Sequence, residues 1–394
     1  MEPARGCIAR HQEARSPGTP PGKSYDPGAA DDMGGAVSQT AAQLATALRR
    51  ARRDATAEVT VLADRPDGTV VRCGHIVAKA HPPGTDPAEL AVRLGVAAHP
   101  RCAGILLPPV DGMAALPDGR QVTLWPYGEP VAPDAPDAAP WAEAGKLLAR
   151  LHSVPIAELP GPLPAMRGPA KAARAIARLR AAALPDSVAT RAVLRAWAGL
   201  PGWARGVDRM DRGVDRMDRL DRVGRPDHRD RADRVEGQDR ADRLEGREHG
   251  DRVDPREGDG VGFGGEDNRL CHGDLHLGQL IRHRATDWRL IDIDDLGLGD
   301  PAWDLARPAA WYAAGLLAAE DWERFLGAYR AAGGSAAGEG DPWPRLDVPA
   351  RALTVQTAAL ALAKAAAAGR ALDEAEEAMV EASVRIAHFM EAAG

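Results

Sequence analysis

Short apolar runs rich in β-branched residues, separated by turn residues, predict a small antiparallel sheet in the first third of the chain. Three runs follow one another closely, and a Pro66-Asp67-Gly68 turn separates the first two. Two further runs come later in the chain. The five predicted strands are residues 59–63, 69–73, 75–80, 104–107 and 121–125. We expect the first three to form a meander.

Apolar residues at helical spacing flank and follow the predicted strands. Residues 37–53 come before the sheet, and residues 87–98 lie between the third and fourth strands. Later helical patterns cover residues 142–151, 170–183 and 187–198, and almost all of the chain after Asp300. A strand-rich portion followed by a helical portion predicts an α+β protein with two lobes.

A low-complexity tract at residues 205–260 interrupts the helical portion, and the dipeptide Asp-Arg occurs in it ten times. Apolar residues from 207 to 220 form a seam close to a heptad, and Asp-to-Arg pairs four residues apart favour a short coiled-coil helix. Gly213, Gly224 and Pro226 break this pattern. We therefore predict a mixed-charge linker, with the short helix as the alternative.

The N-terminal segment, the lack of long apolar runs and the spacing of the cysteines predict a cytoplasmic protein. Residues 1–35 are rich in Pro, Gly and charge, so they are predicted to be disordered, and Met33 is an alternative start of translation. They lack the apolar core of a secretory signal, and no apolar run reaches the length of a membrane span. The cysteines lack disulfide or metal spacing and are Cys7, Cys73, Cys102 and Cys271.

Charge argues against one class of partner. Acidic residues outnumber basic ones, 57 to 50, whereas proteins that bind nucleic acid through its phosphates usually carry a basic excess. The net charge of −7 suits a neutral or cationic small molecule. The composition leaves the oligomeric state open.

The segment with the strongest chemical signal is residues 270–306, which reads LCHGDLHLGQLIRHRATDWRLIDIDDLGLGDPAWDLA. A loop between strand-like runs holds Asp274 and Gln279, and a later apolar run leads to Asp292. Phosphoryl transfer requires a carboxylate for the attacking hydroxyl, oxygen ligands for Mg²⁺ and positive charge on the phosphates. Asp274 suits the first of these roles, and Asp292 suits the second.

Two motifs in this segment resemble those of a known family. HGDLHLGQ resembles the HGDLHxxN catalytic loop of aminoglycoside phosphotransferases and choline-kinase-like enzymes, and LIDIDDLGLGDPAWDLA resembles their metal-binding segment. The resemblance covers roughly residues 55–200 and 268–390. It implies a bilobal protein-kinase-like fold with a small antiparallel-sheet N-lobe and a larger helical C-lobe.

The resemblance also implies a role for each motif residue. Asp274 resembles the catalytic aspartate, and Asp292 resembles the metal-binding aspartate. Gln279 stands where the family usually has an asparagine as its second metal ligand. Asp304 and His272 are expected to support the loop. The implied cofactors are ATP and Mg²⁺.

Further site residues are expected in the first lobe. Lys79 in HIVAKA resembles the strand lysine that contacts the α/β-phosphates, although a lone strand lysine often faces solvent. Its expected ion-pair partner is Glu89 on the next helix. The backbone around Trp125 and Tyr127 is expected to contact adenine, with an ordinary strand end as the alternative.

The resemblance implies domains and a reaction. A disordered tail (1–35) precedes a nucleotide-binding N-lobe (36–128) and a helical C-lobe (129–394), which the insert 205–260 interrupts. The γ-phosphoryl group of ATP would pass to a hydroxyl of a small molecule: an aminoglycoside, a sugar or an aminosugar.

Other readings remain open. Gln279 makes the catalytic loop resemble those of maltokinases and glucosamine kinases. One alternative function is a catalytically weak pseudokinase that serves as a binding protein, and another is a scaffold that acts through the Asp-Arg tract. We expect the helical lobe and the acids Asp294, Asp295 and Asp300 to select the acceptor.

Overall fold

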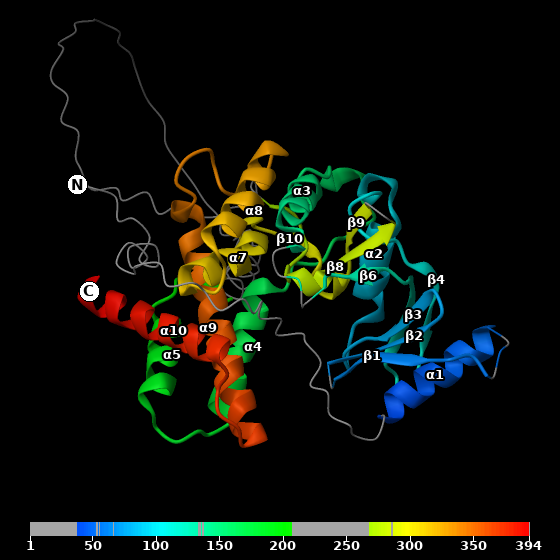
Figure 1. Ribbon diagram of the computed structural model, residues 1–394, viewed down its shortest axis with the longest axis horizontal. Coiled ribbons are helices and arrows are strands. Elements are labelled where there is room, and N and C mark those ends of the chain that lie inside the picture. Colours follow the sequence, from blue (N-terminus) through cyan, green and yellow to red (C-terminus); the bar gives the residue numbers. More distant parts are fainter. Residues whose placement is uncertain are drawn as a thin grey trace, which may run out of the picture.

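Five antiparallel strands form the sheet of the smaller lobe, in the order β1-β2-β3-β5-β4 (Figure 1). They are β1 Thr60–Arg65, β2 Gly68–Cys73, β3 Ile76–Ala80, β4 Val110–Ala115 and β5 Gln121–Pro126. The predicted meander is confirmed, because β2 lies between β1 and β3. The computed structural model describes residues 38–206 and 268–393, apart from residues 53, 55, 66, 133, 134, 136, 137, 285 and 286.

Two helices accompany this sheet. Helix α1 (Gln39–Arg52) buries Ala41, Leu44 and Leu48 against β2 and β3. Helix α2 (Pro87–Ala98) has the predicted bounds and begins after Asp86, whose carboxylate accepts a hydrogen bond from the N–H of Ala88 at 2.8 Å.

One predicted strand was wrong. The apolar run 104–107 contributes a single parallel bridge, from Leu106 to Leu290, and residues 105–107 are buried in the core that they share with the helices of the larger lobe. The fourth strand of the sheet is β4 instead, at its edge beside β5, and Asp111 and Gly112 obscure the alternating pattern of its sequence. Burial rather than strand pairing therefore explains why 104–107 is apolar.

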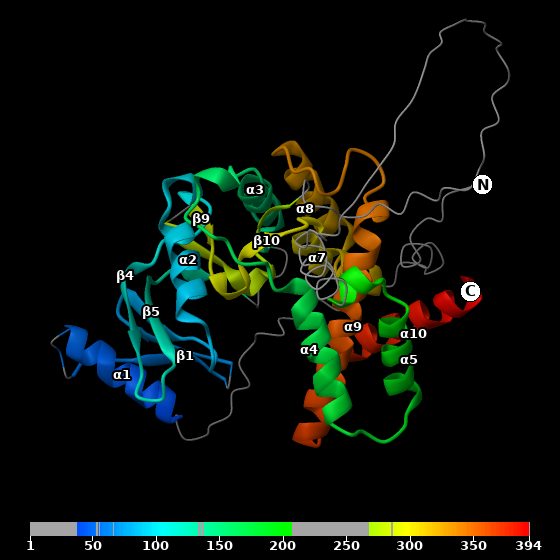
Figure 2. The same ribbon diagram turned by 180° about the vertical axis from the view of Figure 1, so that it is seen from behind.

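Helices make up most of the larger lobe. They are α3 Trp141–His152, α4 Gly168–Ala181, α5 Val188–Ala198, α7 Ala302–Ala314, α8 Ala319–Ala331, α9 Trp343–Ala368 and α10 Glu374–Ala393. Helix α9 packs against α4, α5, α7 and α10, and the view from behind shows α4 beside it (Figure 2). The expected bilobal α+β fold, with a small antiparallel sheet and a larger helical lobe, is confirmed.

Two small sheets hold the segment with the two motifs. Strand β7 (Arg269–Cys271) pairs with β10 (Gly297–Gly299), and β8 (Leu280–Arg284) pairs with both β6 (Glu129–Pro130) and β9 (Asp287–Leu290). The loop 272–279 therefore begins and ends on paired strands.

Some predictions fall outside the described residues. The tail 1–35 lies there, as does the Asp-Arg tract except for residues 205 and 206.

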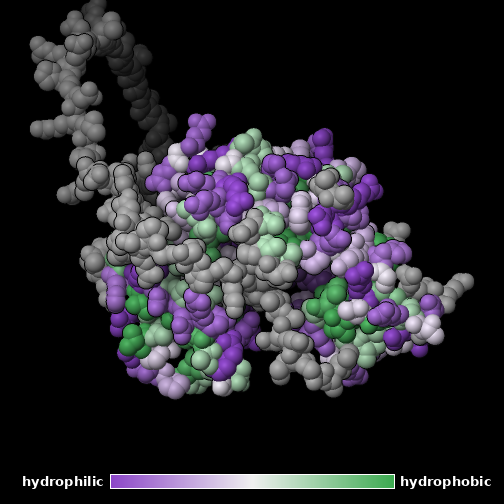
Figure 3. Space-filling model, viewed as in Figure 1, coloured by the Kyte–Doolittle hydropathy of each residue, from purple (hydrophilic) through white to green (hydrophobic). Residues whose placement is uncertain are grey.

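Hydrophilic residues are spread over both lobes on the face shown in Figure 3. Among the helices within residues 38–206 and 268–393, none has the length and apolar character needed to cross a bilayer.

Candidate active site

A cleft of about 470 Å³ lies between the sheet and the segment that carries the two motifs. Its walls include Val70 and Val77 from the sheet, and Ile281 and Ile291 from the other lobe. Its polar residues include Lys79, His81, Gln279, Asp292 and Asp294. Apolar walls with a few polar groups are typical of a site for a small molecule or cofactor.

Trp125 and Tyr127 both line this cleft. The Trp125 indole N–H donates a hydrogen bond to Thr123 Oγ1 at 2.8 Å, and the Tyr127 backbone N–H donates one to the carbonyl of His75 at 2.8 Å. Pro126 has no N–H. Within the stretch of backbone that was expected to contact adenine, the N–H of Tyr127 could therefore do so only in competition with its hydrogen bond to His75.

Lys79 lies at the polar end of the cleft. Its Nζ is 2.6 Å from Asp292 Oδ1 and 3.0 Å from Asp294 Oδ2. Burial opposes the charged form of the lysine, but the two carboxylates outweigh burial and raise the pKa of Lys79 above its ordinary value. The contact between Lys79 and Asp292 joins two lobes across 213 positions of sequence.

The expected ion pair between Lys79 and Glu89 was wrong. Glu89 Oε2 lies 3.0 Å from Arg93 on the same helix and 3.1 Å from Arg167 of the larger lobe. The hydrogen bond from Arg93 has the largest effect, and together with Arg167 it lowers the pKa of Glu89, although partial burial acts in the opposite direction. Two arginines thus engage Glu89, while two aspartates engage Lys79.

His81 was missed in the sequence. It is fully buried, its Nδ1 lies 2.7 Å from Asp294 Oδ1, and its Nε2 lies 2.8 Å from Thr123 Oγ1. Burial would raise the pKa of Asp294, but Lys79 and His81 hold it well below its usual range. The signal was present, because residues two apart on a strand point to the same face and His81 follows Lys79 by two.

Asp292 and Gln279 lie side by side. The Gln279 Nε2 is 3.4 Å from Asp292 Oδ2, and the N–H of Ile291 donates a hydrogen bond to the carbonyl of Gln279 at 2.9 Å. Asp292 has a φ of 64°, in the left-handed region that aspartate and asparagine tolerate better than most residues. A carboxylate beside a side-chain amide is a donor set that fits Mg²⁺, with the amide turned so that its oxygen faces the ion.

Asp304 supports the loop that carries Asp274. Its Oδ2 accepts a hydrogen bond from the N–H of His272 and its Oδ1 accepts one from the N–H of Gly273, both at 2.7 Å. The imidazole Nε2–H of His272 donates to the carbonyl of Ile291 at 2.7 Å. Gly273 has a φ of 83°, and a Cβ there would lie 2.4 Å from the Asp295 carbonyl oxygen, so the loop requires glycine.

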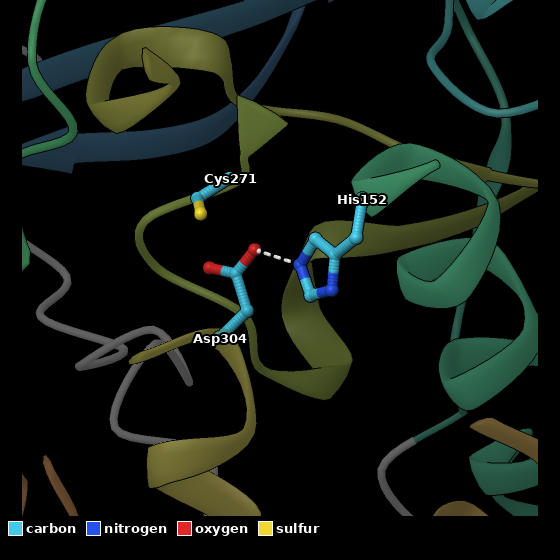
Figure 4. A group of neighbouring side chains, drawn as sticks. All are labelled: His152, Cys271 and Asp304. Carbon is cyan, nitrogen blue, oxygen red and sulfur yellow. Dashed lines mark hydrogen bonds and ion pairs between the residues drawn. The ribbon is translucent and has the colours of Figure 1, made fainter. Parts of the chain in front are cut away.

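His152, Cys271 and Asp304 form a buried group near this loop (Figure 4). His152 Nε2 lies 3.0 Å from Asp304 Oδ2, and its Nδ1 lies 2.9 Å from the Tyr329 hydroxyl. Burial raises the pKa of the Cys271 thiol well above its ordinary value, which disfavours the thiolate that a metal needs. The group therefore supports the loop and is a poor metal site.

Asp274 is engaged by two cations. Its Oδ2 lies 2.7 Å from Lys171 Nζ on α4, and its Oδ1 lies 2.5 Å from an Arg307 nitrogen on α7. Burial would raise the pKa of Asp274, but Lys171 and Arg307 hold it well below its usual range. Lys171 also lies 2.7 Å from Asp295 Oδ2.

Comparison of the sequence with protein-family models identifies the family of this chain. The family model described as the phosphotransferase enzyme family matches residues 68–349, which is most of the chain and includes both motifs and most of the cleft lining. The chain belongs to this family. It is a small-molecule kinase with a protein-kinase-like fold. No curated protein matches the chain.

Two solved structures support the fold. A thermostable mutant of aminoglycoside phosphotransferase APH(4)-Ia, in its apo form, is 12% identical, with a TM-score of 0.51 over 88% of this chain and 98% of that chain. The ternary complex of a thermostable mutant of the same enzyme with AMP-PNP and hygromycin B is 11% identical, with a TM-score of 0.50 over 89% and 99%. A choline/ethanolamine kinase family protein from Mesorhizobium loti also matches at 15% identity, with a TM-score of 0.48 over 88% and 94%.

The arrangement of Glu89 leads to a first prediction. In this kinase, Glu89→Gln is expected to lower kcat/KM for the nucleotide by less than about tenfold, because Glu89 does not orient Lys79. Lys79→Met is expected to lower it by about 100-fold or more, if Lys79 has the expected place next to the phosphates, because the substitution removes that positive charge. Steady-state kinetics of both variants measure this, and equal losses would restore Glu89 as the partner of Lys79.

The support of the loop leads to a second prediction. His152→Leu removes hydrogen bonds to Asp304 and Tyr329, so we expect the free energy of unfolding to fall by about 2 kcal/mol. Urea denaturation measures the change. The matched control is His388→Leu, at an exposed position on α10, which is expected to change stability by less than about 0.5 kcal/mol. Equal effects of the two substitutions would contradict the supporting role of His152.

Proposed function

We propose that this kinase transfers the γ-phosphoryl group of ATP to a hydroxyl of a small molecule, with Asp274 orienting that hydroxyl. The observation that carries the proposal is the contact at 2.6 Å between Lys79 and Asp292 across the cleft. It brings together, at one end of the cleft, a lysine that could bind phosphates and an acid that could bind the metal, both of which phosphoryl transfer needs.

The cleft suits the nucleotide. The related APH(4)-Ia structure contains AMP-PNP, a nucleotide, and we infer that the same region of this chain holds ATP. The adenine would lie between Val70 and Val77 on one side and Ile281 and Ile291 on the other, because these apolar side chains form the walls. Lys79 at the polar end would then neutralise phosphate charge.

Asp292 and Gln279 would hold Mg²⁺, as their adjacent oxygen-bearing side chains suggest. A bound Mg²⁺ would neutralise charge on the β- and γ-phosphates. Lys79 would have to share Asp292 with the ion, and Asp294 would then keep the lysine in place through the contact at 3.0 Å.

Asp274 would act on the acceptor. Its carboxylate remains charged because Lys171 and Arg307 keep its pKa low, so it is a weak base. It would accept a hydrogen bond from the acceptor hydroxyl and orient the oxygen toward the phosphorus. The proton would pass to the carboxylate only late, as the oxygen–phosphorus bond forms and the bond to ADP breaks.

The acceptor is proposed to be an aminoglycoside, a sugar or an aminosugar, and Gln279 keeps the resemblance to the maltokinase and glucosamine-kinase loops. The test is to incubate the purified protein with ATP, Mg²⁺ and a panel of these compounds. ADP release and product mass are then measured. Acceptor-dependent ADP with a product about 80 Da heavier, the mass that one phosphoryl group adds, supports the proposal. Nucleotide binding without turnover on any acceptor would instead favour the binding-protein alternative.

A further inference from the structure

The acids around the catalytic loop are each engaged by a cation of the protein. Asp274 contacts Lys171 and Arg307, and Lys171 also contacts Asp295. Asp294 contacts Lys79, and Arg345 lies 3.6 Å from Asp300. A cationic acceptor would therefore approach carboxylates whose charge a lysine or an arginine already offsets, and it would meet that cation at short range. The sequence-based expectation was that Asp294, Asp295 and Asp300 help to select the acceptor, and it did not include these cations.

A small pocket lies beside Asp274. Its volume is about 10 Å³, and its other lining residues include Leu275, Trp303, Leu353 and Gln356. A pocket of this size holds about one water-sized group. Only the reacting hydroxyl of an acceptor would enter it, with the rest of the molecule across its mouth.

Charge at this pocket is balanced. Two carboxyl groups, of Asp274 in the pocket and of Asp295 beside it, lie within 2.7 Å of the two cations, Lys171 and Arg307. The side chains of Lys171 and Arg307 are 23% and 11% exposed, so solvent screens them only partly. An ammonium group brought here would meet both cations at short range, while the carboxylates that could attract it are already offset by those cations. Like charges at a binding site reduce affinity strongly.

A neutral hydroxyl meets no such penalty. An ionised carboxylate has about four lone-pair directions, and Lys171 and Arg307 each take one on a different oxygen of Asp274. Asp274 can therefore accept a hydroxyl hydrogen without losing either cation. The amide of Gln356 both donates and accepts, which suits another hydroxyl.

We propose that Lys171 and Arg307 select an uncharged polyhydroxylated acceptor and exclude cationic ones. This inference rests on the proposed function, since it concerns the acceptor of the same reaction. It assigns specificity to two residues outside both motifs, and it places aminosugars and polycationic aminoglycosides among the poor acceptors of this kinase.

The first experiment compares neutral, cationic and anionic acceptors, among which glucosamine and glucuronate each differ from glucose in one substituent. The full chain, with ATP and Mg²⁺, is given glucose, glucosamine, glucuronate, maltose and an aminoglycoside, and phosphorylated products are quantified by mass spectrometry. We expect a neutral sugar to be the best acceptor, with kcat/KM at least about 100-fold above that of a cationic compound. A cationic or anionic compound that reacts as well as the best neutral sugar overturns the inference and leaves the kinase reaction intact. No product from any acceptor overturns the inference together with the proposed function.

The second experiment changes the cations. Arg307→Gln and Lys171→Met are each expected to raise the ratio of kcat/KM for glucosamine to that for glucose by at least about tenfold. The matched control is Arg324→Gln, an exposed arginine that pairs with Asp321 on α8, and it should leave the ratio unchanged. Because the readout is a ratio of two kcat/KM values, a general loss of activity lowers both values and leaves the ratio unchanged. An unchanged ratio in both pocket variants would overturn the roles of Lys171 and Arg307.

Discussion

Asp274→Asn is expected to lower kcat by at least about 1,000-fold while the Kd for ATP stays within about threefold. Asparagine keeps the size of the side chain but removes the charge that orients the acceptor hydroxyl and accepts its proton. The contacts proposed for the nucleotide come from Lys79 and the apolar walls of the cleft instead. Single-turnover kinetics measure the first effect, and titration with a fluorescent nucleotide measures the second.

The control for this substitution is Asp186→Asn. Asp186 is 76% exposed and pairs with Arg191 at the surface, so its replacement should leave both quantities unchanged. A kcat for Asp274→Asn within about tenfold of the unmodified protein would remove Asp274 from the catalytic role. A loss of ATP binding together with turnover would show that the loop, not the carboxylate, had failed.

Most of the candidate site could be predicted because its residues lie in contiguous motifs. Asp274 and Gln279 belong to one loop, and Asp292 follows it after a strand hairpin, so local spacing alone brings Gln279 and Asp292 to 3.4 Å. The bounds of the helices could be predicted as well, because caps and apolar spacing also depend on residues close together in the sequence. The N-cap Asp86 marks the start of α2, and its apolar face has helical spacing.

The partners of these residues could not be predicted. Lys171 and Arg307 are basic residues on Ala-rich helices, where such residues usually face solvent. Only the packing of α4 and α7 beside the loop brings them to Asp274. Glu89 shows how a predicted partner can be wrong. It has the expected position on α2, but its carboxylate accepts a hydrogen bond from Arg93, one turn along the helix, instead of pairing with Lys79.

Asp292 also shows how backbone and chemistry are combined at one position. It adopts a left-handed conformation with a φ of 64°, and its Oδ1 accepts a hydrogen bond from the N–H of Asp294 at 3.3 Å. This conformation turns the chain sharply after β9 and directs the carboxylate toward both Lys79 and Gln279. Residues that are poor in the left-handed region, such as valine, would strain this turn whatever their chemistry.

Asp292→Asn therefore isolates the charge of this residue. Asparagine tolerates the left-handed conformation, so the turn should persist, but a neutral amide is a weaker ligand for Mg²⁺ than a carboxylate. We expect kcat to fall by at least about 100-fold and the Mg²⁺ concentration for half-maximal activity to rise by about tenfold or more. Gln279→Ala should raise the Mg²⁺ requirement as well, with a smaller loss of kcat, and Gln279→Asn should retain partial activity.

Asp294→Asn is the matched comparison, because Asp294 shares Lys79 with Asp292 but is also hydrogen-bonded to His81. We expect it to weaken nucleotide binding through Lys79 without changing the Mg²⁺ requirement. Metal titrations of the four variants at saturating ATP distinguish these roles. An unchanged Mg²⁺ dependence in Gln279→Ala would leave Asp292 as the sole ligand of the pair. An unchanged dependence in Asp292→Asn would remove the metal from this side of the cleft, because no other carboxylate of the described cleft lining lies beside the Gln279 amide.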